Sequence, residues 1–104
     1  MAEIEEYLTT DQNALTTMIS EFVTEWNKAA DENLDPNNPI EKLSWVGAEF
    51  DENGVLTNYR EFVEKLTEQY NKNAAAANQE MQYKFQEQLK DIQFYTDTLN
   101  LYEE

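Results

Sequence analysis

The chain has 104 residues, of which 22 are acidic, 7 are basic and none is histidine or cysteine, giving a formal net charge of -15. A chain of this length forms one small domain with a modest core, so function is expected on a surface rather than in a deep pocket. The charge repels phosphate backbones and anionic membranes, and the lack of cysteine excludes disulfides, thiolate metal sites and cysteine nucleophiles.

Two interpretations of the acidity remain. The carboxylates either form a solvated helical surface or imitate DNA as a decoy in the basic groove of another protein. The acidic N-terminus has no apolar core, and no apolar run approaches the roughly twenty residues that span a bilayer. We therefore expect neither a signal peptide nor a membrane anchor. The prolines at 36 and 39 and the glycines at 47 and 54 mark one central interruption in a chain that otherwise favours helix.

The first helix is expected at about residues 3–31. Apolar residues recur there at steps of three and four, the pattern of an amphipathic helix with one buried face. They are Ile4, Leu8, Leu15, Met18, Phe22, Trp26 and Ala29, with Ile19 and Val23 beside them. Asp11 interrupts this stripe, and Thr9-Thr10-Asp11 could cap a helix that restarts there. The alternative is a continuous helix with one polar position in its seam.

A loop and connector are expected at about residues 32–57. Residues 31–39 are rich in turn formers and contain both prolines. The segment from Ile40 to Leu43 has the apolar spacing of one helical turn. Four large side chains of the connector are expected to form a small apolar cluster, because a short segment must bury them somewhere. These are Trp45, Phe50, Val55 and Leu56.

Within the connector, Asp51-Glu-Asn-Gly54 predicts a chain reversal. Asp and Asn bond their own backbone, and Gly54 accepts a positive φ without a Cβ clash. Phe50, Val55 and Leu56 flank this turn and favour a small β-hairpin. Asn58 precedes Glu61 by three residues, the pattern of a capping box at a helix start.

The second helix is expected at about residues 59–103. Its apolar positions again follow steps of three and four, and they include Leu66, Leu89 and Ile92. Residues 71–78 are its weakest part, because four alanines favour helix strongly while the flanking asparagines favour turns. Either the helix runs through for roughly 70 Å, at about 1.5 Å per residue, or it bends back there. A continuous helix would leave an apolar seam exposed to a partner or to a second copy.

No residue set indicates an active site, a cofactor or a small-molecule substrate. The acidic pairs Glu5-Glu6 and Glu103-Glu104 have no His, Cys or Arg beside them. Asp51 and Asn53 alternate as in a calcium loop, but Gly54 comes too early and the bidentate Glu is missing at the required offset. The segment therefore predicts an ordinary turn, and the protein is not expected to be an enzyme.

Trp45-Val-Gly47 is similar to the Trp-x-Gly turn of the small helical-hairpin substrates of type VII secretion. In that family the motif lies in a tight turn between two helices, whereas here a proline-containing loop precedes it. The tail element of the family, a Tyr followed four residues later by an acid, is absent after Tyr95, where Leu99 stands. The Trp45-Val-Gly47 match alone keeps a type VII secretion substrate or adaptor as an alternative.

A longer run resembles a unit of bacteriophage tail tape-measure proteins. The run is Ala48-Glu-Phe-Asp-Glu-Asn-Gly-Val-Leu-Thr-Asn-Tyr59, and a helix follows it that ends in Tyr95-Thr-Asp-Thr-Leu-Asn-Leu-Tyr-Glu-Glu104. Upstream, Glu6-Tyr-Leu-Thr-Thr-Asp-Gln-Asn-Ala-Leu15 resembles the helix before this motif, so the likeness covers most of the chain and leaves out residues 33–39. Tape-measure proteins run to many hundreds of residues, so this chain corresponds to an excised segment or to a small diverged relative.

The resemblance implies a structural role in the virion, located in the phage tail or, during assembly, in the bacterial host cytoplasm. It carries over only structural motif positions: Phe50, Asp51, Asn53, Gly54, Leu56, Asn58 and Tyr59. The expected fold is all-α, a single helical domain built as an antiparallel helical hairpin or coiled coil with a short irregular or β-hairpin connector. Its packing seam is expected to comprise Leu15, Phe22, Trp26, Leu66, Leu89 and Ile92. The expected partners are proteins, or a second copy that contacts the apolar seams, and neither nucleic acid nor membrane.

Overall fold

The fold consists of three helices and a long connector. The computed structural model describes the backbone of residues 2–32, 37 and 39–103, and side chains at 11–32, 37 and 39–101. Helix α1 spans Ala2–Glu32, α2 spans Tyr59–Asn73, a 3-10 turn (η1) spans Ala74–Ala76, and α3 spans Gln79–Glu103. The all-α prediction is confirmed. Of the two alternatives for residues 59–103, a continuous helix or a bend within 71–78, the structure adopts the bend, so the described chain has three helices rather than a two-helix hairpin.

Some expectations lie outside the described residues. They concern the side chains of Ile4, Leu8 and the two acidic pairs, and most of the segment 33–39. Within the described part, α1 continues without a break past Asp11. A partly buried Thr16 hydroxyl donates to the carbonyl of Gln12 at 2.8 Å, one turn earlier in the same helix. The continuous alternative for the first helix is therefore the one that the structure adopts.

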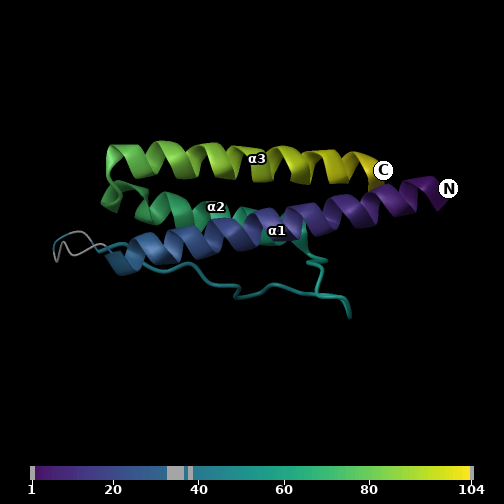
Figure 1. Cartoon of the computed structure of the whole chain (residues 1–104), viewed down its shortest axis with the longest axis horizontal. Helices are drawn as coiled ribbons and strands as arrows, with labels where there is room; N and C mark the ends of the chain where they lie inside the picture. Colours follow the sequence, from purple (N-terminus) through teal and green to yellow (C-terminus); the bar gives the residue numbers. More distant parts are fainter. Residues whose placement is uncertain (1, 33–36, 38, 104) are drawn as a thin grey trace.

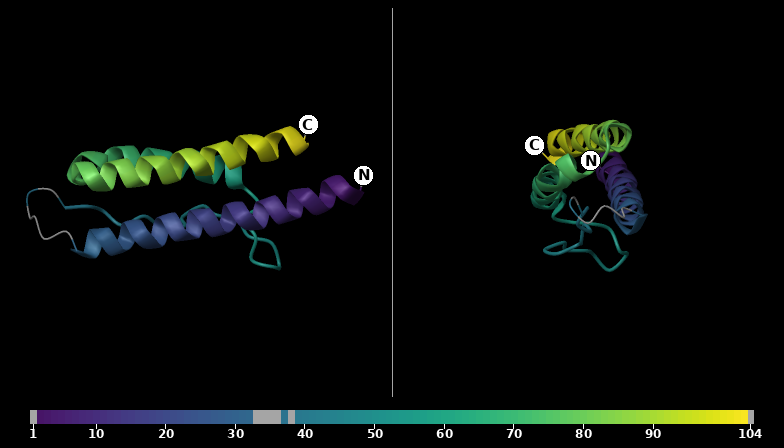
Figure 2. Two further views of the ribbon diagram at one scale, coloured as in Figure 1. Left: turned by 45° about the horizontal axis from the view of Figure 1, so that its top comes forward. Right: turned by 90° about the vertical axis from the view of Figure 1, so that its left-hand side faces the viewer.

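The connector reverses the chain direction before α2 begins. From residue 39 it runs back alongside α1, so α1 and α2 run in the same direction and α3 runs opposite to both (Figure 1). In the end-on view the three helices form a triangle, with the connector on the side away from α3 (Figure 2). The molecule measures 53 × 25 × 17 Å. The connector thus takes the place that a fourth helix has in a four-helix bundle.

The chain bends back at Ala77 and Asn78. Ala77 is extended, with φ -83° and ψ 148°, and its N–H donates to the carbonyl of Ala74 at 3.1 Å. The Asn78 side chain accepts from the N–H of Met81 at 2.9 Å, so it caps α3 in the way that asparagine favours. The Gln82 amide donates to the carbonyls of Ala74 and Ala77, both at 2.8 Å. These bonds satisfy backbone groups that a helix end leaves open.

An aromatic cluster forms the centre of the core. Phe22 and Trp26 of α1 meet Tyr70 of α2 and Phe85 of α3 edge-to-face, with ring centroids 5.0 to 6.1 Å apart. Each large apolar side chain buried in this way contributes roughly 1.5–3 kcal/mol, and such aromatic pairs add to that. The seam residues of the sequence are all buried in this one core: Leu15, Phe22, Trp26, Leu66, Leu89 and Ile92. Because the chain bends, α2 and α3 bury Leu66, Leu89 and Ile92 against α1 and each other in this core.

Candidate interaction surfaces

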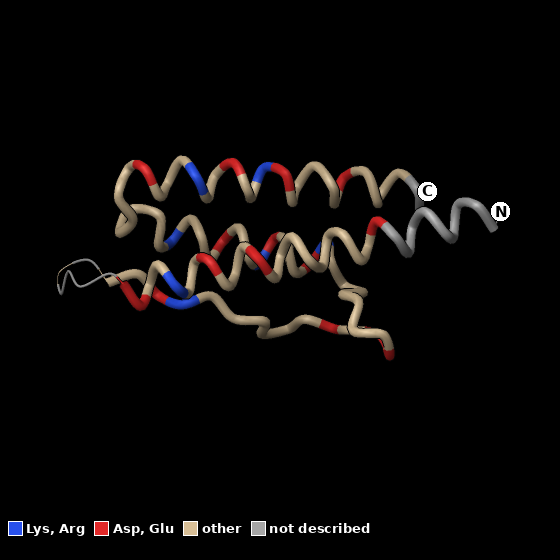
Figure 3. The backbone as a smooth tube through the Cα atoms, viewed as in Figure 1, with Lys and Arg blue, Asp and Glu red and all other residues tan. Residues whose placement is uncertain are grey.

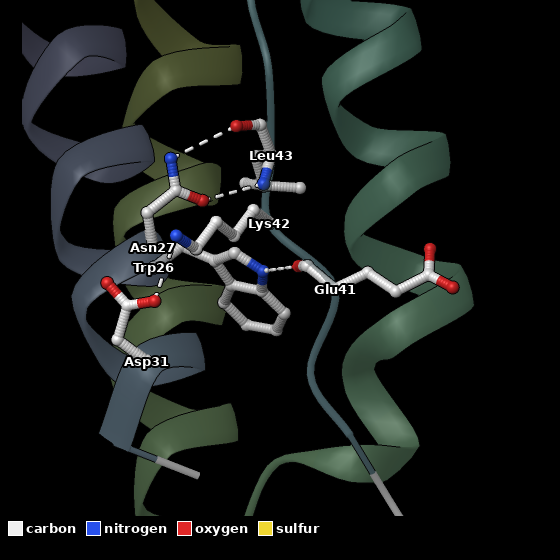
Figure 4. Close-up of polar contacts among 6 residues, drawn as sticks. All are labelled: Trp26, Asn27, Asp31, Glu41, Lys42 and Leu43. Atoms are coloured by element: carbon white, nitrogen blue, oxygen red, sulfur yellow. Dashed lines mark hydrogen bonds and ion pairs between the residues drawn. The ribbon is translucent and has the colours of Figure 1, made fainter.

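Residues 39–46 of the connector form no helix or strand and run alongside α1; we call this segment the strap. Ile40 and Leu43 are buried between the helices, although their spacing suggested a helical turn. The strap lies along α1 because side chains of α1 bind its backbone (Figure 4). The Trp26 Nε1–H donates to the carbonyl of Glu41 at 2.8 Å.

Asn27 holds the strap at two points. Its Nδ2 donates to the carbonyl of Leu43 at 3.0 Å, and its Oδ1 accepts from the N–H of Leu43 at 2.7 Å. The amide thus pairs with one residue of the strap as a neighbouring strand would. An exposed ion pair between Lys42 and Asp31, at 2.9 Å, lies beside these bonds (Figure 4). The sequence indicated none of these roles; a mid-helix asparagine beside a buried tryptophan was the available signal, because asparagine is unfavourable inside helices.

The tape-measure-like run forms a compact corner. An Asp51 carboxylate oxygen accepts the N–H groups of Asn53 at 2.8 Å and Val55 at 3.0 Å. Gly54 has φ +80°, the positive value predicted for it. The expected β-hairpin is reduced to one isolated antiparallel bridge between Phe50 and Leu56. Asp51 therefore serves its own turn, and in the described part no group of three or more acidic, His or Cys residues is placed to hold a metal ion.

The hydrogen bonds of Asn58 differ from those predicted for it. It lies at the start of α2 but makes no capping bond to that helix. Its Oδ1 accepts from the N–H of Glu49 at 2.8 Å, and its Nδ2 donates to the carbonyl of Gly47 at 2.7 Å. The capping-box prediction with Glu61 is thus wrong for Asn58. The side chain closes the corner instead, because two backbone groups of the incoming chain lie within its reach.

The expected apolar cluster of the connector divides into an inner and an outer part. Val55, Leu56 and the motif residue Tyr59 are buried, and the N–H of Leu56 donates to the Thr16 hydroxyl of α1 at 3.0 Å. Trp45 stacks on Phe62 of α2 with ring centroids 4.9 Å apart. Phe50 only leans on Trp45 and stays 46% exposed. Phe50 is therefore not the buried anchor that the sequence suggested.

A shallow cleft of about 380 Å³ lies between α2 and α3. It is lined by Arg60, Val63, Glu64, Thr67, Glu68, Gln93, Thr96, Asp97 and Asn100. The hydroxyls of Thr67 and Thr96 each donate to a carbonyl of their own helix. The Asn100 side-chain oxygen is buried without a hydrogen-bond partner. The two threonine hydroxyls of the lining thus donate to backbone carbonyls and not to the carboxylates of Glu64, Glu68 or Asp97.

Among the described residues, acidic positions occur along all three helices and the connector, with fewer basic positions between them (Figure 3). Besides Lys42–Asp31, an exposed ion pair joins Lys84 of α3 to Glu25 of α1 at 3.2 Å. Exposed pairs of this kind contribute little stability. The acidic residues are thus distributed over every described helix and the connector rather than confined to one element.

Among the described helix residues, the large apolar side chains that are exposed all lie on the side of α3 away from the other helices. Tyr83 is 69% exposed, Phe94 70% and Leu101 71%. They face away from the buried side of α3, which is formed by Phe85, Leu89, Ile92, Thr96 and Leu99. In the ribbon views no described helix or connector segment lies on the side of α3 away from α1 and α2, which agrees with the exposure of these three side chains (Figures 1 and 2).

Comparison of the chain with protein-family models, characterised proteins and solved structures finds no match. No helix among the described residues is both long and apolar enough to cross a membrane.

Proposed function

We propose that this chain is a non-enzymatic structural component of a bacteriophage tail, a helical segment of a tape-measure-like protein. The proposal rests on the resemblance of residues 48–59 to the tape-measure unit, and the geometry of the same residues supports it. Asp51 and Asn58 use their side chains on the backbone of the chain, and Leu56 and Tyr59 are in the core. Motif side chains that bind backbone groups or lie in the core are those expected of an architectural role.

The observation that carries the proposal is this use of the motif. The corner determines where the chain turns into α2, and the core then positions α3 beside α1. The role of such a unit would be passive: its helices pack along their apolar faces, and the connector fixes where the chain reverses. The place of action would be the virion tail, and the host cytoplasm while tails assemble.

Mass spectrometry of tails purified from the phage whose genome encodes the chain tests this proposal. Peptides of the chain should copurify with tails through density-gradient steps, and its reading frame should lie between the tail-tube and baseplate genes. Peptides that occur in infected cells but not in purified tails would overturn the proposal. A reading frame beside a restriction system or a toxin would contradict it as well.

A second candidate, an acidic inhibitor that imitates DNA, is favoured by the net charge of -15. A decoy of this kind binds the basic groove of a DNA-handling protein, and its affinity falls steeply as salt is raised. If the chain bound such a protein at physiological salt and competed with DNA, the inhibitor role would be supported and the structural role would be contradicted. No comparable observation favours the type VII alternative, because Gly47 lies in the connector well before α2 begins.

A further inference from the structure

The exposed face of α3 has a regular pattern along the helix. Tyr83 and Phe94 are eleven residues apart, close to three turns, and therefore point in the same direction. Glu87 and Lys90 lie between them on the same side, and both are exposed. In the described part of the chain neither charge takes part in an ion pair or a hydrogen bond. Along the helix the face therefore presents an aromatic residue, a negative charge, a positive charge and a second aromatic residue. Successive members are four, three and four residues apart.

This order is self-complementary when the helix direction is reversed. With a two-fold axis midway between Glu87 and Lys90, Tyr83 of one copy lies opposite Phe94 of the other, and Glu87 lies opposite Lys90. Each of these pairs occurs twice, as two-fold symmetry requires. The spacing of four, three and four residues keeps all four positions on one side of a helix that packs at about 20° to its copy.

We propose that two copies of this chain associate through the outer face of α3, antiparallel, with Tyr83 against Phe94 and Glu87 against Lys90 of the other copy. The occupant is a second copy because only an identical helix offers both the aromatic and the charged matches in one register. Two features limit the affinity. The paired helix length is about 16 Å, which corresponds to an interface at the weak, transient end, and each copy carries a charge of -15.

The net charge gives this dimer an unusual salt dependence. Repulsion between two acidic molecules is long-ranged and is screened by salt, and Glu80 and Asp97 also fall opposite each other at the rim. Screening should relieve this repulsion by more than it weakens the few direct charge pairs. Association should therefore strengthen as salt rises from about 0.05 to about 0.5 M, whereas a DNA-imitating decoy loses affinity over the same range.

Reciprocal charge reversal tests the pairing. The full chain, Glu87→Lys, Lys90→Glu and the double variant are compared by sedimentation equilibrium at concentrations up to about 1 mM, since the expected affinity is weak. Each single variant places like charges opposite each other and should associate at least about tenfold more weakly. The double variant should associate as the unmodified chain does, and an equimolar mixture of the two single variants should form a heterodimer.

Two controls separate this result from general charge effects. Glu21→Lys changes an exposed glutamate of α1 by the same amount and should not weaken association. Circular dichroism should show that all variants keep their helix content and thermal unfolding. The proposal is overturned when the unmodified chain stays monomeric at high salt, when the mixed single variants stay apart, or when Glu21→Lys acts as Glu87→Lys does. None of these outcomes bears on whether the chain is found in phage tails.

Discussion

At the scale of single residues, a few polar side chains determine where the backbone turns. Asn27, Asn58 and Asn78 each bind main-chain groups, but of different elements: the strap, the corner and the first turn of α3. Asparagine suits these places because one amide both donates and accepts. A sequence pattern shows that such a residue favours turns and caps, but not which backbone groups it will reach.

Gly54→Val should destabilise the chain. Gly54 has φ +80°, which side chains with a branched Cβ strongly disfavour, and an added Cβ would meet no atom within 4 Å, so backbone strain is the only cost. We expect a loss of about 1 kcal/mol or more, measured by thermal or urea unfolding. Gly54→Asn is the matched variant and should lose less, because asparagine tolerates positive φ. Equal stability of Gly54→Val and the unmodified chain would show that the turn does not hold this conformation.

Tyr70 should make stability sensitive to alkaline pH. Burial raises the pKa of its phenol above the ordinary value, although a side-chain hydrogen bond with Gln86 acts in the opposite direction. As the pH rises past about 10, the unfolded chain loses the Tyr70 proton before the folded chain does, so the unfolding free energy falls. In Tyr70→Phe this contribution is absent.

Urea unfolding at pH values from neutral to about 11 measures this effect. The unmodified chain should be more stable than Tyr70→Phe near neutral pH, where the Tyr70 hydroxyl donates to the carbonyl of Gln82 at 3.2 Å. The difference should shrink as the pH rises through the window above 10. A constant difference across that range would contradict the account of Tyr70.

At the scale of elements, the strap is the part that sets this fold apart from a bundle made of helices alone. It packs Ile40 and Leu43 in the core and depends on Trp26 and Asn27 for its backbone hydrogen bonds. The bonds join residues 15 and 16 positions apart in the sequence. Local propensity therefore could not predict the strap, and the three-residue spacing of its buried side chains pointed to a helical turn instead.

Asn27→Ala should loosen the strap. The substitution leaves both the N–H and the carbonyl of Leu43 without their partner in a partly buried place, and we expect a loss of about 1–3 kcal/mol. Asn13→Ala is the matched control, since Asn13 is an exposed asparagine of the same helix and its replacement should stay within about 0.5 kcal/mol. Amide hydrogen exchange at Leu43 should accelerate in Asn27→Ala only. Unchanged exchange there would mean that Asn27 does not hold the strap.

The helices were predictable from the spacing of apolar residues, and residues 71–78 were identified as a place where the second helix could bend, but the sequence did not decide between a bend and a continuous helix. In residues 71–78 the alanines favour continuation and the asparagines favour a turn, so local preferences conflict. Tertiary packing favours the turn, because bending brings Phe85 of α3 against Phe22 and Trp26 of α1 and places Ile92 in the same core. Among the surfaces, the line of Tyr83, Phe94 and Leu101 could have been found from helical spacing alone. The cleft between α2 and α3 could not, because it depends on the bend.

At the scale of the whole molecule, the predicted packing seam is buried inside one chain, and one apolar line stays exposed on the outer side of α3. A molecule of 53 × 25 × 17 Å with a buried aromatic centre presents carboxylates almost everywhere and an apolar line on α3. Contacts with other molecules must therefore use surface features such as the corner and the outer face of α3. We call this arrangement, in which α2 and α3 fold back beside α1 around one core, the closed form. The proposed tail role and the proposed pairing of copies both depend on it.

The most direct test of this closed form is the distance between α2 and α3 in solution. The chain has no native cysteine, so spin labels can be placed on Glu64→Cys and Asp97→Cys alone. Both positions line the same cleft, and packed helix axes are about 8–10 Å apart, so electron paramagnetic resonance should show strong short-range dipolar coupling. A continuous helix from residue 59 to 103 would instead separate the two sites by roughly 50 Å at about 1.5 Å per residue. The folded bundle predicts the short distance, and the long one would contradict it.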